Sequence, residues 1–305
     1  MSRRGWALFV AMCAIWGIPY LLIRVAIRDF EPGTLVFART VLPAAILLPL
    51  AFHRGLVRPL LPHWRILALY TVVEIAGPWY LLSAAEQRLT SSLTGLLVAA
   101  VPLIGAVAVF FVGHGEDRLD ARRLLGLAVG FAGVVALVGI EVRGAELAAV
   151  GQVALTAIGY AVGPLIIARR LAHLPSLGVV AVTLALTAVG YAPYALTHLP
   201  ASVSAEAGAS VALLAIVCTA VAFLLFFALI AEVGPARATV ITYVNPAVAV
   251  LLGVLLLDEP LSAGILVGFP LILLGSFLAT ARNRKPGVGP DDEVRVRHTP
   301  QPVER

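Results

Sequence analysis

Long apolar stretches separated by short polar ones make up most of the chain, from residue 6 to residue 281. A helix needs about 20 mainly apolar residues to cross the hydrocarbon core of a bilayer. The pattern predicts an all-α membrane protein with ten transmembrane helices, at residues 6–27, 34–52, 64–83, 90–112, 124–140, 148–168, 177–197, 209–230, 238–257 and 262–281. Residues 282–305 are polar and contain Pro and Gly, which predicts a disordered tail.

The composition agrees with this class. Hydrophobic residues make up 60% of the chain and charged residues 13%, against about 45–50% and 25% in soluble proteins. The net charge of +5 comes from short loops and tails, so there is no basic face of the kind that binds nucleic acid. Cys13 and Cys218 lie in apolar runs without a CxxC spacing, which supports neither a disulfide nor a metal site.

The basic residues predict the orientation. With the N-terminus inside, external loops hold Arg28, Arg88 and Arg143, two further arginines lie within spans, and the other 17 of the 22 Lys and Arg are cytoplasmic. Cytoplasmic loops of membrane proteins carry such an excess, so both termini are expected in the cytoplasm. Arg is used almost to the exclusion of Lys, which indicates a bacterial chain and hence the plasma (inner) membrane.

The fourth and fifth predicted spans resemble the ninth and tenth. The matched pairs are Pro102 with Pro246, Glu116 with Glu259, Leu119 with Leu261, Gly126 with Gly268 and Gly133 with Gly275. Because each repeat has five spans, the second copy must enter the membrane inverted, which divides the chain into repeats at 1–140 and 141–281. Inverted repeats are a recurrent design of secondary transporters, with the substrate near the midplane between the halves. The alternative is a duplication that serves packing only.

Small residues at a four-residue spacing predict close helix contacts, because they let two backbones approach. The spacing occurs at Gly126 and Gly130, at Gly159 and Gly163, and at Gly264 and Gly268. Pro102 and Pro246 lie within spans and are candidates for helix kinks, since each removes a backbone hydrogen bond.

The segments AIWGIPYLLIRVA at 14–26 and LVFARTVLPAAILLPLA at 35–51, with the two Pro-containing repeats, resemble the EamA family of the drug/metabolite transporter superfamily. The resemblance covers about residues 6–281. It implies a ten-helix transporter of small metabolites with a central cavity. The family's Trp-Gly pair and following basic residue correspond to Trp16-Gly17 and Arg24, and its second-helix Arg corresponds to Arg39. The family pattern has no counterpart of Glu74.

Three charges fall within predicted spans, namely Arg24, Arg39 and Glu74. A charge at membrane depth usually faces a partner or a wet cavity. In one reading, Arg39 and Glu74 form a buried ion pair that fixes helix packing. In the other, Glu74 lies beside the cavity and carries a proton or meets a cationic substrate group. Arg24 lies near the end of its span, where a long basic side chain often reaches the interface.

Further polar and aromatic candidates for the substrate site are Trp16, Tyr20, Trp79, Tyr80, Gln152, Tyr160, Tyr243 and Asn245. Trp79 and Tyr80 lie near a membrane boundary, where an aromatic belt is the ordinary explanation. Tyr243 and Asn245 precede Pro246, and an interhelical hydrogen bond is the simpler role for Asn245. Trp16 and Tyr160 occupy the first spans of the two halves, which favours cavity lining.

The leading hypothesis is a secondary active transporter, an exporter of amino-acid-like or drug-like metabolites by alternating access, with protons as the candidate coupling ion. The chain contains no GxxxxGK[ST], HExxH or GxSxG pattern, so ATP hydrolysis and intramembrane enzyme chemistry are not indicated. No cofactor is expected. A non-transporting membrane scaffold or assembly subunit is the alternative, and the sequence leaves the oligomeric state open, a homodimer included.

Overall fold

The computed structural model of the chain describes residues 1–112, 121–234, 238 and 240–280. Helices and their connections account for all of these residues, with no strand among them. The all-α prediction is therefore confirmed for the described part. Glu116 and the predicted tail at 282–305 lie outside the described residues.

Each predicted span corresponds to one helix or to a few helical pieces in series. Those of the first half are α1 (Arg3–Gly17), α2 (Pro19–Ala26), α3 (Pro32–His53), η1 (Arg58–His63), α4 (Trp64–Tyr70), η2 (Thr71–Ala76), α5 (Gly77–Ala85), α6 (Ser91–Val98), α7 (Val101–Val112) and α8 (Ala121–Glu141).

The second half begins with a short turn and continues in the same way. Its elements are η3 (Gly144–Glu146), α9 (Leu147–Ile166), η4 (Ile167–Leu171), α10 (Ser176–Thr197), α11 (Ala205–Ala215), η5 (Ile216–Val221), α12 (Ala222–Val233), α14 (Ile241–Leu257) and α15 (Ala263–Thr280). Among the described residues, eight helical segments are long and apolar enough to cross a membrane, and Ser91–Val107 and Ile241–Leu257 are shorter apolar helices.

The two prolines predicted to kink their helices behave differently. Pro102 is the second residue of α7, and two turn residues, Ala99 and Ala100, separate α6 from α7 just before it. Pro246 lies within α14, which continues without a break in secondary structure from Ile241 to Leu257. A proline at the start of a helix gives up an amide that would be unpaired in any case, whereas one in the interior removes a helix hydrogen bond.

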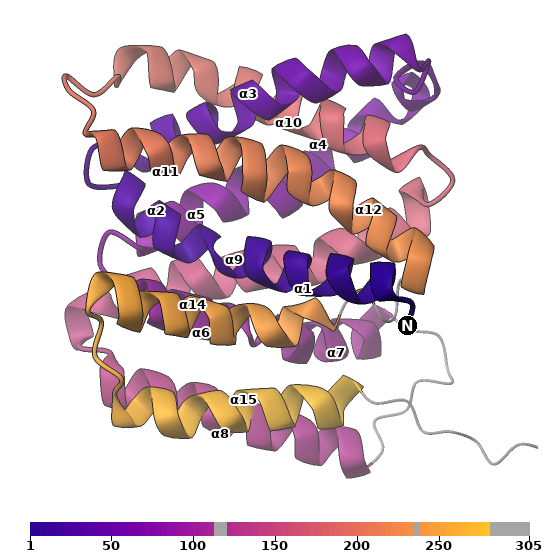
Figure 1. Cartoon of the computed structure of the whole chain (residues 1–305). Helices are drawn as coiled ribbons and strands as arrows, with labels where there is room; N and C mark the ends of the chain where they lie inside the picture. The colour runs from indigo at the N-terminus through magenta and orange to yellow at the C-terminus, as the bar shows by residue number, and fades with distance from the viewer. Residues whose placement is uncertain (113–120, 235–237, 239, 281–305) are drawn as a thin grey trace, which may run out of the picture.

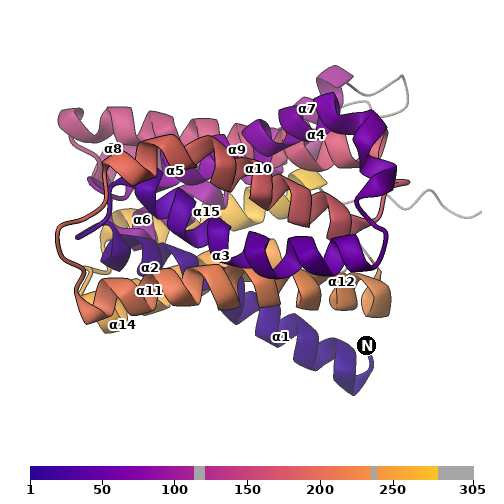
Figure 2. The same ribbon diagram turned by 90° about the horizontal axis from the view of Figure 1, so that it is seen from above.

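Two pairs of long antiparallel helices bracket the bundle (Figure 1). The α3 and α10 pair lies along one side and the α8 and α15 pair along the opposite side. Between them, α2 contacts α11, α5 contacts α9, and α6 contacts α14. Figures 1 and 2 both show the N-terminus and α12 at one end of the bundle, here called the amino-terminal end, and the other end is called the far end.

Glycines allow the closest of these contacts. A Cβ added to Gly133 on α8 would lie 2.9 Å from the carbonyl oxygen of Gly268 on α15, and one added to Gly126 would lie 2.8 Å from that of Gly275. On α9, Gly159 faces the backbone carbonyl of Val73 too closely for a Cβ. The close packing predicted from the glycine spacing is thus found in both halves.

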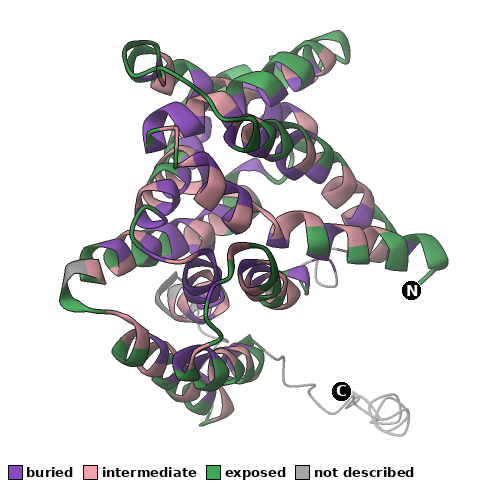
Figure 3. Cartoon of the chain, turned by 60° about the vertical axis from the view of Figure 1, so that its left-hand side comes forward, coloured by how far each residue is buried: buried purple, intermediate pink, exposed green. Residues whose placement is uncertain are grey.

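Many large hydrophobic side chains are exposed on the outside of the bundle, and Figure 3 shows how far each residue is buried. Large hydrophobic side chains are more than half exposed on several helices, for example Val135, Val189, Leu255 and Phe277, while buried residues gather toward the middle. An exposed apolar surface of this extent indicates an interaction surface. Together with the lengths of the helices, it fits a lipid environment.

Three of the helical segments in the described part of the chain contain a π-helical turn. Thr71–Ala76 interrupts the segment from α4 to α5, Ile216–Val221 interrupts the segment from α11 to α12, and Ile167–Leu171 follows α9. The first two lie in the third predicted spans of their halves. Such turns are rare and often occur at functional sites, and the first of them carries Glu74.

Candidate functional site

Arg39 lies in the interior of the bundle, on α3. Its side chain is only 4% exposed, and its guanidinium carbon stands 3.7 Å from the centroid of the Trp79 ring. This is a cation–π contact, which strengthens when the cation is removed from water. The Nε of Arg39 is buried without a hydrogen-bond partner. Tyr160, Cys218 and Glu86 lie within electrostatic range of the guanidinium.

Glu74 projects from the π-helical turn toward α9. Its carboxylate lies against Gly163, at a place where no Cβ would fit, and its Oε2 is buried without a hydrogen-bond partner. Arg28 and Glu206 form an ion pair at the surface, but Arg39 and Glu74 have no nitrogen–oxygen distance of 4 Å or less. The ion pair that the sequence suggested between Arg39 and Glu74 is therefore not formed in this structure.

Tyr160 lies near both of these charges. It lies on α9 within electrostatic range of both Arg39 and Glu74. The arrangement brings one cation and one carboxylate into the same interior region, without direct neutralisation of one by the other. Each retains a buried polar atom that a third group could satisfy.

Glu86 is a buried carboxylate that the sequence reasoning missed. It follows α5 directly, is completely buried, and neither of its carboxylate oxygens has a hydrogen-bond partner. The predicted span ended at residue 83, which assigned Glu86 to a loop. A signal was present, because Leu82, Ala85, Glu86 and Leu89 follow the i, i+3, i+4, i+7 spacing of one helix face, and all four are buried.

Arg24 binds next to this carboxylate. Its Nη1 donates a hydrogen bond to the backbone carbonyl oxygen of Glu86, and Arg24 lies within electrostatic range of the Glu86 side chain. The guanidinium also lines a cavity of about 350 Å³ together with Ile27, Arg28 and Gln87. Arg24 therefore makes a hydrogen bond to the protein backbone and also faces a cavity.

Glu259 connects the two halves at the far end. Its carboxylate accepts hydrogen bonds from the backbone amides of Ser91 and Ser92, at 2.8 and 2.9 Å, and from their hydroxyls, at 3.0 and 2.5 Å. Ser91 is the first residue of α6. An acidic group at this position satisfies otherwise unpaired amides and complements the helix dipole.

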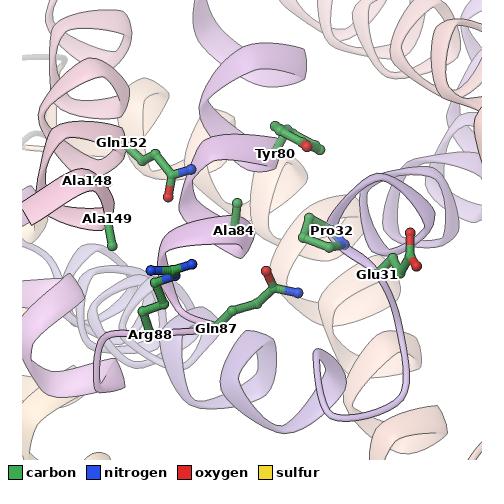
Figure 4. A pocket seen from close by; sticks show the side chains of 9 residues that line it. All are labelled: Glu31, Pro32, Tyr80, Ala84, Gln87, Arg88, Ala148, Ala149 and Gln152. Atoms are coloured by element: carbon green, nitrogen blue, oxygen red, sulfur yellow. The ribbon is translucent and has the colours of Figure 1, made fainter. Parts of the chain in front are cut away.

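A larger cavity of about 460 Å³ opens at the far end (Figure 4). It lies between the start of α3, the end of α5 and the start of α9, and it is lined by Glu31, Pro32, Tyr80, Ala84, Gln87, Arg88, Ala148, Ala149 and Gln152. Two of the residues considered from the sequence, Tyr80 and Gln152, thus face a cavity. Gln87 lines this cavity and also the smaller one beside Arg24.

Of the remaining candidates in the first half, one packs against aromatic rings and the other lies in the interior. Trp16 packs against Phe223 and Phe226 of α12, with ring centroids 6.0 and 4.7 Å apart. Tyr20 on α2 is buried, within electrostatic range of Tyr160 and Glu86. Tyr20 therefore belongs to the interior polar region, whereas Trp16 belongs to the packing between α1 and α12.

The candidates around Pro246 make contacts between helices. The hydroxyl of Tyr243 lies 2.8 Å from Oγ1 of Thr280 on α15. With its amide oriented toward the nearby acceptors, Asn245 donates to the carbonyl oxygens of Ile241, at 2.9 Å, and of Cys13, at 3.2 Å. The second bond joins α14 to α1, which is an interhelical hydrogen bond of the kind considered for Asn245.

Comparisons with known proteins define the class. The EamA-like transporter family matches residues 3–139 and again residues 147–281. The uncharacterized inner membrane transporter YedA of Escherichia coli strain K12 is 30% identical over 301 residues, covering 93% of this chain and 94% of its own. A probable amino-acid metabolite efflux pump of the same strain is 23% identical over 91% of this chain and 95% of its own.

A crystal structure, described simply as that of a protein, superposes with a TM-score of 0.63 at 23% identity and covers 90% of this chain and 96% of that one. It supports the fold. The chain belongs to the EamA-like transporter family, in the drug/metabolite transporter superfamily. It is accordingly a multi-pass inner membrane transporter and not an enzyme.

Proposed function

We propose that this chain is a secondary active transporter that exports small amino-acid-like or drug-like metabolites by alternating access between two inverted five-helix repeats. The observation that carries the proposal is the interior region around Arg39 and Glu74. There, a cation and a carboxylate are held apart, each with a buried atom that lacks a partner. A small molecule that carries complementary charges would satisfy both.

The helix contacts support the inverted repeat at 1–140 and 141–281. A two-fold axis that exchanges the repeats places each predicted span of one half on the corresponding span of the other half. Three helix pairs join corresponding spans and are therefore unchanged by this exchange: α3 with α10, α8 with α15, and α6 with α14. The contact of α2 with α11 becomes the contact of α9 with α5, which is also present. Two of the three π-helical turns, at Thr71–Ala76 and Ile216–Val221, also correspond, whereas Ile167–Leu171 has no counterpart among the described residues of the first span. The two separate matches of the family support the same division.

The distribution of basic residues supports an N-terminus in the cytoplasm. Among the described residues, the amino-terminal end of the bundle carries Arg3, Arg4, Arg54, Arg58, Arg65, Arg122, Arg123, Arg169 and Arg170, and the far end carries Arg28, Arg88 and Arg143. By the positive-inside rule the far end is external. Both cavities would then open to the outside, where an exporter releases its substrate.

The direction and the substrate class draw on one relative. The probable amino-acid metabolite efflux pump of Escherichia coli is named for export, and it is 23% identical to this chain. An amino-acid-like molecule has an ammonium group that would suit Glu74 and a carboxylate that would suit Arg39, because charge-assisted hydrogen bonds are the strong ones. Protons are the proposed coupling ion, with Glu74 as their carrier.

The test has two stages. A deletion strain grown against toxic amino acids and cationic drugs identifies compounds that the transporter removes. Flux of those compounds is then measured in liposomes that contain the purified protein. We expect saturable flux that Arg39→Met and Glu74→Gln each reduce at least tenfold, with the exposed variants Arg143→Met and Glu206→Gln as matched controls. Full flux in Arg39→Met and Glu74→Gln would refute the placement of the site.

A further inference from the structure

Glu86 and Glu259 are neighbouring carboxylates with opposite surroundings. They lie within electrostatic range of each other. Glu259 accepts four hydrogen bonds from Ser91 and Ser92. Neither carboxylate oxygen of Glu86 has a partner, although the residue is completely buried. The protein thus supplies a full set of donors to one carboxylate and none to the other.

This difference favours different protonation states. An ionised carboxylate that is buried without hydrogen-bond donors is costly, and such a group is held more cheaply as the neutral acid. The four donors around Glu259 suit a charged carboxylate. In the described conformation, the surroundings of Glu86 suit a carboxylic acid.

The charged and titratable groups that face Glu86 come from three directions. Arg24 and Tyr20 approach from α2, Arg39 from α3, and Glu259 from the segment before α15. Although two of these groups are cations, no nitrogen of either lies within 4 Å of the Glu86 carboxylate. Arg24 instead donates to the backbone carbonyl of the same residue.

Two cavities lie next to Gln87, the residue that follows Glu86. Gln87, the next residue, is exposed and lines both cavities of the far end. Arg24, whose guanidinium binds at Glu86, lines the smaller one. Glu86 itself lines neither cavity, so its carboxylate reaches water only when Arg24 or Gln87 moves.

We propose that Glu86 is a proton-binding site of the transporter, occupied in the described conformation and emptied when Arg24 moves from the Glu86 carbonyl to its carboxylate. The proton released from the carboxylic acid passes to water in the cavity, and the carboxylate that remains is neutralised by Arg24. Arg24 then no longer presents a free charge to the smaller cavity. Proton occupancy at Glu86 thereby sets the charge of the cavity wall. The role in coupling rests on the proposed function, but the occupancy of the site does not.

The occupancy can be measured without a substrate. Infrared spectroscopy of the purified full-length protein in lipid nanodiscs separates the carbonyl stretch of a protonated carboxylic acid from the stretches of ionised carboxylates. Spectra of wild type, Glu86→Gln, Glu74→Gln and Glu206→Gln are compared at neutral pH and in D₂O. Glu74→Gln controls for the other buried glutamate, and Glu206→Gln controls for an exposed one.

We expect a component of the carboxylic acid band in wild type that persists at neutral pH. Glu86→Gln should lose this component, and the two control variants should keep it. Absence of the band in wild type, or its persistence in Glu86→Gln, would overturn the proposal. If Glu86→Gln does not fold, Glu86→Asp decides, because an aspartic acid at this site should shift the component and an unshifted component would exclude Glu86. Flux is not part of this readout, so a failure of the transport assay leaves the result interpretable.

Discussion

A double-mutant cycle on Arg39 and Glu74 separates a structural ion pair from two independent site residues. The variants are Arg39→Met, Glu74→Gln and their combination. The two charges do not contact each other within 4 Å in this structure. The coupling energy between the two substitutions should therefore be well below the about 3–5 kcal/mol expected when one partner of a buried ion pair is removed.

The expected effect of Arg39→Met alone is small. The contact of the guanidinium with the Trp79 ring contributes about 2 kcal/mol when desolvated. The unpartnered Nε costs about 1–3 kcal/mol, and Met, of similar length, fills most of the space. These terms nearly offset, so we expect a net change within about 1 kcal/mol, or about 2–4 °C in Tm.

An ion pair predicts a different pattern. Removal of one partner of a buried pair costs about 3–5 kcal/mol, and removal of the second restores much of it. Thermal unfolding of the purified variants, followed by intrinsic fluorescence in detergent, distinguishes the two. A Tm for Arg39→Met that is lowered by more than about 6 °C, and is recovered in the double variant, would refute our reading of the geometry.

Three further changes test other contacts. Glu259→Ala leaves the buried donors at the start of α6 unsatisfied and should lower stability by about 2–4 kcal/mol, measured as Tm against Glu206→Ala. Gly163→Ala puts a Cβ onto the Glu74 carboxylate, whereas Gly151→Ala meets nothing within 4 Å, so the first should abolish flux in liposomes and the second should preserve it. In the loop after α2, hydrogen bonds from Ser204 lower the pKa of Asp29. The stabilising contribution of Asp29 is therefore present above its unfolded pKa and is lost as pH falls through its folded pKa. Asp29→Asn should consequently flatten the acid limb of a Tm–pH profile.

The apolar pattern predicted the helices well because each run had to satisfy one condition, the thickness of a bilayer. Ends of helices were less certain. The third span continues beyond residue 83, where Ala85 and Glu86 remain on a buried face. An acidic residue at the end of an apolar run usually indicates a loop. Only the apolar Leu89 beyond Glu86 indicated that the buried helix face continues.

The site was predicted in part. The sequence identified Arg39 and Glu74 as charges within predicted spans, but a position along a span does not fix the direction in which a side chain points. In the structure, Arg39 lies over Trp79 and Glu74 lies against Gly163. These directions depend on the π-helical turn and on helix packing. The cap that Glu259 provides on Ser91 and Ser92 also joins segments far apart in sequence, which no local pattern indicates.

Proton-driven flux in liposomes tests the central claim most directly. A substrate found in the growth screen is loaded into liposomes that contain the purified protein, and its release is followed with and without an imposed pH gradient. We predict that release saturates with substrate concentration and accelerates when the pH gradient is imposed. When a protonophore collapses the gradient, the rate of release should fall to the rate measured without a gradient. A non-saturating leak that ignores the gradient, equal to that of liposomes without protein, would contradict the account.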